Sequence, residues 1–247
     1  MPDDKRHRFI EEYGVAQISM NLTNISVTPV HVAFDERLDG SFRQLSARLE
    51  RLVDSFTPAQ ELAFALANAL SLLDLLEQRG HFTREQFERA VGRISFFVNS
   101  GIRFIEEMCK MRAFVELWDE LLVERYGVEN EKYRRFRYGV QVNSLGLTET
   151  QPENNVQRIV LEMLGVTLSK RARARSVQLP AWNEALGLPT EDSARLALRT
   201  QQVIASESGI ADVADPLGGA WAIEKLTDEI VRRSRRYIER IDEMGGA

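Results

Sequence analysis

The sequence predicts an α/β protein: a partial TIM-type (β/α) barrel with about four parallel strands, flanking helices and a C-terminal helix. Two observations support this fold class. Short strand patterns alternate with helical patterns along the chain, as in parallel βα units with right-handed crossovers. Each predicted strand has one polar face, whereas a sheet covered by helices on both sides would be apolar on both. The polar faces therefore favour part of a barrel over an open sheet.

The composition excludes several classes of protein. The chain has 32 Lys+Arg against 37 Asp+Glu, a formal net charge of -5, which offers no electrostatic case for nucleic acid or an anionic membrane as a partner. Cys109 is the only cysteine, so no internal disulfide can form. The first residues are too charged for a signal peptide, and the most apolar run, near 62–76, is expected to be too short and broken to span a bilayer. We expect a cytoplasmic protein.

The chain divides near residue 56. Residues 1–55 form a divergent N-terminal segment with one predicted strand, near 21–28, that Pro29 ends. Residues 56–247 carry the regular alternation of strands and helices. We therefore expect half of a barrel, plus the C-terminal helix, in 56–247.

Capping signals and apolar periodicity predict the helices. Thr57 and Gln60 form a capping box with Pro58 at the first helical position, and Thr83 and Gln86 repeat the box before a shorter helix. The remaining helices follow apolar stripes with helical spacing. The expected helices cover about 58–79, a short segment after Thr83, 102–126, 155–168, 190–206 and 226–244.

The predicted strands share a polar face. Besides 21–28, they cover about 93–99, 135–143 and 174–179, with side chains alternating between two faces. The polar face is formed by Asn24, Ser26 and Thr28; Arg93, Ser95 and Asn99; Arg137, Gly139, Gln141 and Asn143; and Ser176 and Gln178. An ordinary barrel interior is packed with Val, Ile and Leu. This lining predicts a hollow channel for a long polar ligand, although a solvated sheet face would give the same pattern.

Chemistry in such folds collects at the carboxyl ends of the strands. The polar side chains expected there are Asn99, Gln141, Asn143, Gln178 and, in the following loop, Glu184. Neutral amides do not suit acid-base hydrolysis, which needs paired carboxylates or an oriented histidine. They suit the positioning of a reactive species without proton transfer.

Several sequence runs resemble the adenosylcobalamin-dependent acyl-CoA mutases, most closely their ethylmalonyl-CoA mutase branch. The resemblance covers about residues 56–247. The matching runs are Arg93-Ile-Ser-Phe-Phe-Val-Asn, Glu106-Glu-Met-Cys-Lys-Met-Arg-Ala-Phe, Arg134-Arg-Phe-Arg-Tyr-Gly-Val-Gln-Val-Asn-Ser-Leu-Gly-Leu-Thr-Glu, Gln151-Pro-Glu-Asn-Asn-Val-Gln-Arg-Ile-Val, Gln178-Leu-Pro-Ala-Trp-Asn-Glu-Ala-Leu-Gly-Leu-Pro and Glu239-Arg-Ile-Asp-Glu-Met-Gly-Gly.

The resemblance implies a radical carbon-skeleton rearrangement of an acyl-CoA held along the barrel axis. It implies that Arg93 and Ser95 contact coenzyme A, with Arg93 able to meet phosphate. It likewise implies that Gln141 lies beneath the corrin and adenosyl group, that Glu184 holds the adenosyl ribose, and that Lys132 lies near that region.

A histidine of the same family hydrogen-bonds the thioester carbonyl, and His31 is its candidate here. The family has a Tyr-His pair at this place, but Val30 stands where the tyrosine would be. None of the histidines, His7, His31 and His81, lies in an Asp-x-His-x-x-Gly loop, which supplies the lower cobalt ligand in the family. No metal site is predicted in this chain.

The resemblance implies missing parts, so three functions stay open. We expect no counterpart of the first half of the barrel and no cobalamin domain in this chain. The first hypothesis is a subunit or truncated member of a mutase, oligomeric and completed by a partner chain that supplies the other half-barrel and binds adenosylcobalamin. The second is a non-catalytic relative that binds CoA esters or acts as a scaffold. The third is cobalamin-free chemistry in the CoA channel, disfavoured because no acid-base pair is visible.

Overall fold

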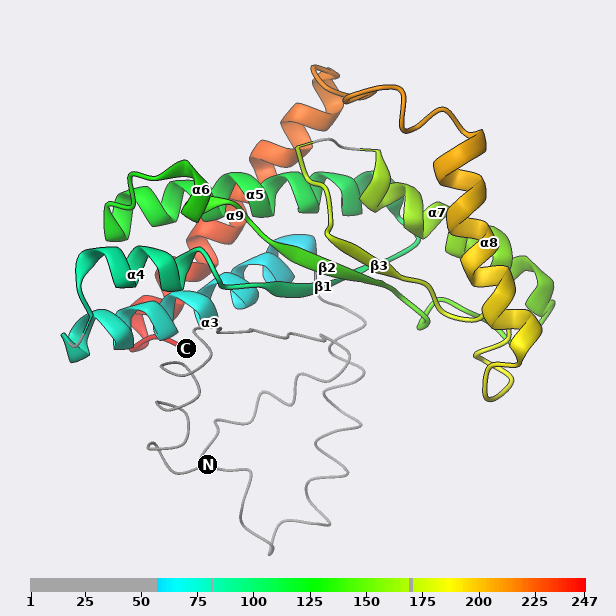
Figure 1. Ribbon diagram of the computed structural model, residues 1–247, viewed down its shortest axis with the longest axis horizontal. Coiled ribbons are helices and arrows are strands. Elements are labelled where there is room, and N and C mark those ends of the chain that lie inside the picture. Colours follow the sequence, from blue (N-terminus) through cyan, green and yellow to red (C-terminus); the bar gives the residue numbers. More distant parts are fainter. Residues whose placement is uncertain (1–56, 81, 169–170) are drawn as a thin grey trace, which may run out of the picture.

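The computed structural model describes residues 57–80, 82–168 and 171–247 (Figure 1). The strand predicted near 21–28 and the candidate His31 lie outside these residues. The described elements, in chain order, are α3 (Pro58–Arg79), α4 (Arg84–Val91), β1 (Phe96–Ser100), α5 (Phe104–Tyr126), α6 (Glu131–Arg134), β2 (Tyr138–Val142), the 3-10 helix η3 (Pro152–Asn154), α7 (Asn155–Thr167), β3 (Ser176–Gln178), α8 (Glu191–Glu207) and α9 (Trp221–Glu243).

A parallel sheet of three strands, in the order β1-β2-β3, forms the centre of the described part. Val98 pairs with Val140, and Val140 with Val177, so the strands advance in register. Helices follow the strands as βα units require, which confirms the α/β class and its likeness to part of a TIM-type barrel. The strands are shorter than expected. For β1 the reason is that the chain at Arg93 is still in the turn that follows α4.

The apolar face of the sheet packs against helices. Phe96 and Tyr138 are 2% and 1% exposed, and Val140 is fully buried. Phe96 meets Trp118 of α5 with ring centroids 5.1 Å apart, and α7 contacts both β1 and β2. Figure 1 shows α5 and α7 lying along the same side of the sheet. Each buried aromatic or aliphatic side chain contributes roughly 1.5 to 3 kcal/mol, so this face holds the βα layers together.

The helix ends follow the predicted signals, with one exception. Both capping boxes form, and Gly80 ends α3 with a left-handed φ of 62°. The last helix starts at Trp221, five residues before the predicted start. Trp221 is 76% exposed, so the first turn of α9 carries no continuous apolar stripe from which its start could be recognised.

Helix α3 is the most apolar segment of the described chain. Its 22 residues are long and apolar enough to cross a membrane by length and composition, which corrects the expectation that this run is too short. However, most of its leucines and alanines are buried, among them Leu62, Leu66 and Leu70, and α3 packs against α5 and α9. The core of a globular domain accounts for its composition.

Candidate functional site

A row of amide side chains crosses the polar face of the sheet. Asn99 of β1 pairs in register with Gln141 of β2, and Gln141 pairs with Gln178 of β3. Residues in register across parallel strands project to the same face, so the three amides form one row. Asn99 is buried, Gln141 is half-buried and Gln178 is exposed. The predicted polar face therefore exists, near the carboxyl ends of the strands.

A second row lies two residues earlier in each strand, and it is less polar than the sequence suggested. Gly139 stands between Phe97 and Ser176. A Cβ added to Gly139 would lie 2.7 Å from the Ser176 Oγ and 3.0 Å from the Phe97 ring, so glycine is required for these side chains to lean over β2. The half-buried Phe97 adds an aromatic surface to the face.

A buried asparagine joins the two loops at the carboxyl end of the sheet. The Asn155 side chain is fully buried at the start of α7. Its Nδ2 donates to the Thr148 carbonyl at 3.0 Å and to the Trp182 carbonyl at 2.9 Å, and its Oδ1 accepts from the Thr148 amide at 3.1 Å and from Arg158 at 2.8 Å. The loop after β2 is thereby fixed to the loop after β3.

Glu184 lies in the loop that Asn155 holds. Its side chain is exposed, and its amide donates to the Ala181 carbonyl at 3.0 Å within a tight turn. The adjacent Asn183 has a buried Oδ1 with no hydrogen-bond partner among the residues that the structure describes. Gln141 and Glu184 thus both lie at the carboxyl edge, as predicted, beside an acceptor that can take a donor from a ligand.

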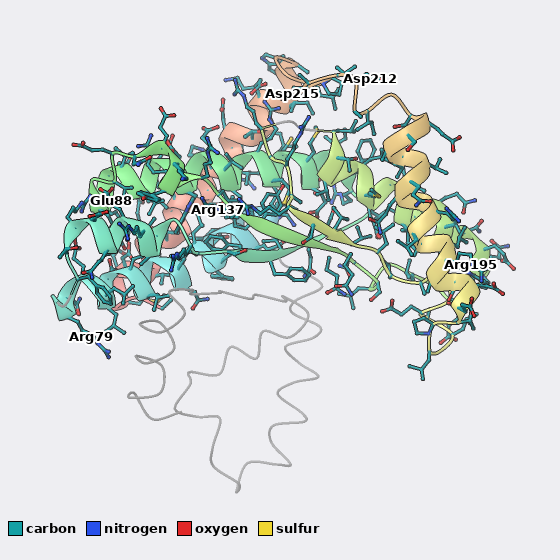
Figure 2. All side chains as sticks on the ribbon, viewed as in Figure 1. Arg79, Glu88, Arg137, Arg195, Asp212 and Asp215 are labelled. Carbon is teal, nitrogen blue, oxygen red and sulfur yellow. The ribbon has the colours of Figure 1, made fainter. Side chains whose placement is uncertain are left out.

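Arginines gather at the opposite, amino edge of the sheet. Arg137 directly precedes β2 (Figure 2), and its Nη2 donates to the Lys132 carbonyl at 3.2 Å. Burial, and then the charges of Arg175 and Arg135, lowers the pKa of Arg137. The Nη1 atom of Arg137 is buried and finds no hydrogen-bond partner within the described ranges. An unpartnered guanidinium nitrogen among like charges favours the binding of an anion.

The structure separates the predicted site residues into two groups. Arg93 lies in the turn after α4, and Ser95 just before β1, so both are at the amino edge. Lys132 is also there, exposed on α6, and the structure does not bring it together with Gln141. Arg137 and Gln141 are four strand residues apart, about 13 Å at 3.3 Å per residue. This spacing suits a long ligand with its anionic end at the arginines.

Two residues of this site were not recognised as such from the sequence. Arg137 was assigned to the polar face without a role, although its position among Arg135 and Arg175 at neighbouring strand starts is a signal for an anion site. Asn155 was noted only at the start of a helix. Its partners Thr148 and Trp182 are brought to it by the fold, and no local pattern marks them.

The fold and the two edges together define an α/β protein with part of a TIM-type barrel, whose sheet has one polar face. The model of the methylmalonyl-CoA mutase family matches residues 55–247, and the chain belongs to this family. A second family model, described as a formiminotransferase domain, matches residues 7–48. His31 therefore lies outside the mutase match.

Curated relatives include three acyl-CoA mutases. The chain is 61% identical over 191 residues to ethylmalonyl-CoA mutase of Cereibacter sphaeroides and 55% identical over 191 residues to ethylmalonyl-CoA mutase of Methylorubrum extorquens. It is 37% identical over 190 residues to the 2-hydroxyisobutanoyl-CoA mutase large subunit of Aquincola tertiaricarbonis. Each alignment covers 77% of this chain, but only 29%, 28% and 33% of the respective relative.

Proposed function

We propose that this chain forms part of the catalytic barrel of a cobalamin-dependent acyl-CoA mutase, acting on a substrate of the ethylmalonyl-CoA or methylmalonyl-CoA type. The observation that carries the proposal is the match of residues 55–247 to the methylmalonyl-CoA mutase family, in a chain whose sheet has a row of amides near its carboxyl edge. Coenzyme A carries phosphates at one end and the acyl thioester at the other. A channel with arginines at one edge and amides at the other matches this order of groups.

The phosphates of coenzyme A are assigned to the amino edge. Arg93 and Ser95 were predicted to contact coenzyme A, and Arg137 extends this group. Because Lys132 lies beside Arg137, we assign it to the phosphates as well, in place of the cofactor role that the resemblance implied. Charge-assisted hydrogen bonds to phosphate contribute about 1.5 to 3 kcal/mol each, so this edge would supply much of the binding energy.

The carboxyl edge is assigned to the acyl group and adenosylcobalamin. Gln141 is half-buried on the channel face, where its amide can contact the cofactor, and the carboxylate of Glu184 is exposed and suits the hydroxyls of a ribose. The free acceptor on Asn183 fits an additional donor from a ligand. Adenosylcobalamin supplies the radical chemistry of the rearrangement. This chain's residues orient the thioester and shield it from water.

The proposal requires further protein. The relatives are about three times as long as the matched segment, and one of them is named a large subunit. We propose that a partner chain supplies the other half-barrel and the cobalamin-binding domain, and that the complex acts in the cytoplasm as an oligomer. The burial of the apolar residues of α3 within the core accounts for this helix without a membrane.

Copurification and an isomerase assay test the proposal. The full chain is purified with its bound partners, or mixed with candidate partners, and assayed with adenosylcobalamin on ethylmalonyl-CoA and methylmalonyl-CoA. Isomerisation is expected, with a loss of at least tenfold in kcat for Gln141→Ala and no loss for the remote Arg199→Ala on α8. CoA binding without activity in every mixture would instead favour the non-catalytic relative. If no mixture shows CoA binding or activity, both hypotheses are refuted.

A further inference from the structure

A charged cluster is buried between α3 and α5, next to the carboxyl end of β1. Lys110 is 1% exposed, and its Nζ donates to Glu61 Oε2 at 2.6 Å. Glu107 Oε2 lies 2.5 Å from the same Nζ. Glu61 is itself 8% exposed. Lys110 and Glu61 have therefore been removed from water together, beside the half-buried Glu107, and such burial is costly unless the groups are well partnered.

The cluster binds the backbone of one strand residue, Asn99. The Asn99 amide donates to Glu61 Oε1 at 3.3 Å, and Lys110 Nζ donates to the Asn99 carbonyl at 2.9 Å. The neighbouring residues bond to β2 instead: the Phe96 amide donates to the Arg137 carbonyl, and the Ser100 carbonyl accepts from the Asn143 amide. The backbone groups of Asn99 thus point away from β2, and the Glu61–Lys110 pair occupies the place of a neighbouring strand.

The charges of this cluster are mutually dependent. Burial raises the pKa of Glu61, which the charge of Lys110 opposes. Burial also disfavours the charge of Lys110, but the carboxylates of Glu107 and Glu61 outweigh it and raise the pKa of Lys110. Apolar residues of similar volume often stabilise a core as well as a buried ion pair does. The position that this pair imposes on Asn99 therefore explains why the pair is present better than a contribution to stability does.

We propose that Glu61 and Lys110 are positioning residues that hold Asn99 at the head of the amide row formed with Gln141 and Gln178. Glu61 accepts from the Asn99 amide and Lys110 donates to the Asn99 carbonyl, and both of these groups face away from β2. These hydrogen bonds hold the end of β1 in place beside β2. They also close this edge to strand pairing at Asn99, so a strand that extends the sheet beyond β1 would pair only with earlier residues. The consequence for catalysis rests on the proposed mutase function, whereas the consequence for the strand does not.

Two conservative substitutions separate positioning from charge balance. Glu61→Asp keeps the charge but shortens the side chain, whereas Glu61→Gln keeps the reach but has only one acceptor oxygen for two donors, the Asn99 amide and the Lys110 Nζ. Glu107→Gln is the matched control, since Glu107 contacts Lys110 without contacting Asn99. Hydrogen exchange is followed in the 96–100 segment of the full chain, with unfolding monitored by circular dichroism.

Positioning predicts that exchange at Asn99 is at least tenfold faster in Glu61→Asp and Glu61→Gln, and within threefold of wild type in Glu107→Gln, which removes a charge beside Lys110 but no acceptor of the Asn99 amide. Unchanged exchange in a folded Glu61→Asp overturns the proposal. If Glu61→Asp does not fold, the Glu61→Gln measurement decides alone, and unchanged exchange in it overturns the proposal.

The reconstituted enzyme gives a second readout. Glu61→Asp is expected to lower kcat at least tenfold with KM for the acyl-CoA within threefold, because the amide row adjoins the reacting end and not the phosphates. A rise in KM with unchanged kcat contradicts the positioning role. If wild-type mixtures are inactive, the proposed function fails, while the hydrogen-exchange comparison still decides the role of Glu61.

Discussion

Asn155 shows how one side chain can organise the edge of a site. Its amide has two donors and one acceptor oxygen, and all of them are used by Thr148, Trp182 and Arg158. The two loops that it joins belong to different βα units, and one carries Glu184. The position of Glu184 relative to Gln141 therefore depends on a residue that is fully buried.

Replacing Asn155 tests this organisation. Asn155→Ala leaves buried carbonyls of Thr148 and Trp182 without donors and is expected to lower the free energy of unfolding by roughly 2 to 4 kcal/mol. Hydrogen exchange should accelerate in 145–150 and 181–185 together. Urea unfolding measures the first effect, and the exposed neighbour Asn154→Ala is the control. Acceleration in only one loop would contradict the joint role.

Glu162 is a buried carboxyl group with an unusual titration. It is 1% exposed on α7, and its Oε2 has no hydrogen-bond partner in the described part of the chain. Burial, with a smaller contribution from Glu107, raises the pKa of Glu162 from 4.5 to about 8, against the opposing charge of Arg158. The folded protein therefore holds this proton more tightly than the unfolded chain does.

The raised pKa of Glu162 predicts a pH dependence of stability. Its contribution is fully present below pH 4.5 and is lost as the pH rises to about 8, because charging a buried carboxylate opposes folding. Glu162→Gln, which mimics the neutral acid, should raise the free energy of unfolding at pH 8.5 by a few kcal/mol, at about 1.4 kcal/mol per pKa unit, and change it little at pH 5. Thermal melts at both pH values test this, with exposed Glu153→Gln as control. Equal effects of Glu162→Gln on stability at pH 5 and pH 8.5 would be inconsistent with a raised pKa of Glu162 in the folded protein.

At the scale of elements, the close approach of α5 and α7 depends on Gly165. A Cβ at this position would lie 3.0 Å from the Glu107 Cβ, 3.2 Å from the Ser100 Oγ and 3.3 Å from the Phe104 carbonyl oxygen. The Ser100 hydroxyl also donates to the Glu162 carbonyl at 2.7 Å. Strand β1 and helices α5 and α7 thus meet at a point where no side chain fits.

The sign of the change in the free energy of unfolding of Gly165→Ala distinguishes helix packing from helix propensity. In an exposed helix this change stabilises by about 1 kcal/mol. Here we expect destabilisation by roughly 1 to 3 kcal/mol, because the added methyl forces the two helices apart. Urea unfolding measures the difference. A stabilised variant would mean that the α5–α7 contact tolerates expansion.

Local sequence signals predicted some elements well and others poorly. The capping boxes at Thr57 and Thr83 and the alternation in 138–142 depend only on neighbouring residues, so they were recognisable. The amide row needed one further step, the register of parallel strands. The bonds from Lys110 and Glu61 to Asn99 join residues far apart in sequence, so only the fold reveals them. A lysine placed between the apolar residues Met108, Cys109 and Met111 of α5 was the available hint.

For the whole molecule, the sheet separates two kinds of chemistry. Its amino edge gathers positive charge around Arg137, and its carboxyl edge presents amides and Glu184. The sheet face between them carries Phe97 and Ser176, which lean over Gly139. This polarity matches the proposed ligand, which is elongated, with an anionic tail and a neutral reactive head, and the proposed chemistry requires no proton-transfer pair at the head.

Titration of the full chain with coenzyme A tests this account most directly. Coenzyme A is expected to bind, and Arg137→Met, which keeps the aliphatic stem but removes the guanidinium, should weaken binding at least tenfold, the equivalent of about 1.4 kcal/mol. Pantetheine, which lacks the phosphates, should bind the wild type and Arg137→Met equally, and Arg199→Met should leave coenzyme A binding unchanged. Coenzyme A binding of equal strength by wild type and Arg137→Met would contradict the assignment of the amino edge to the phosphates.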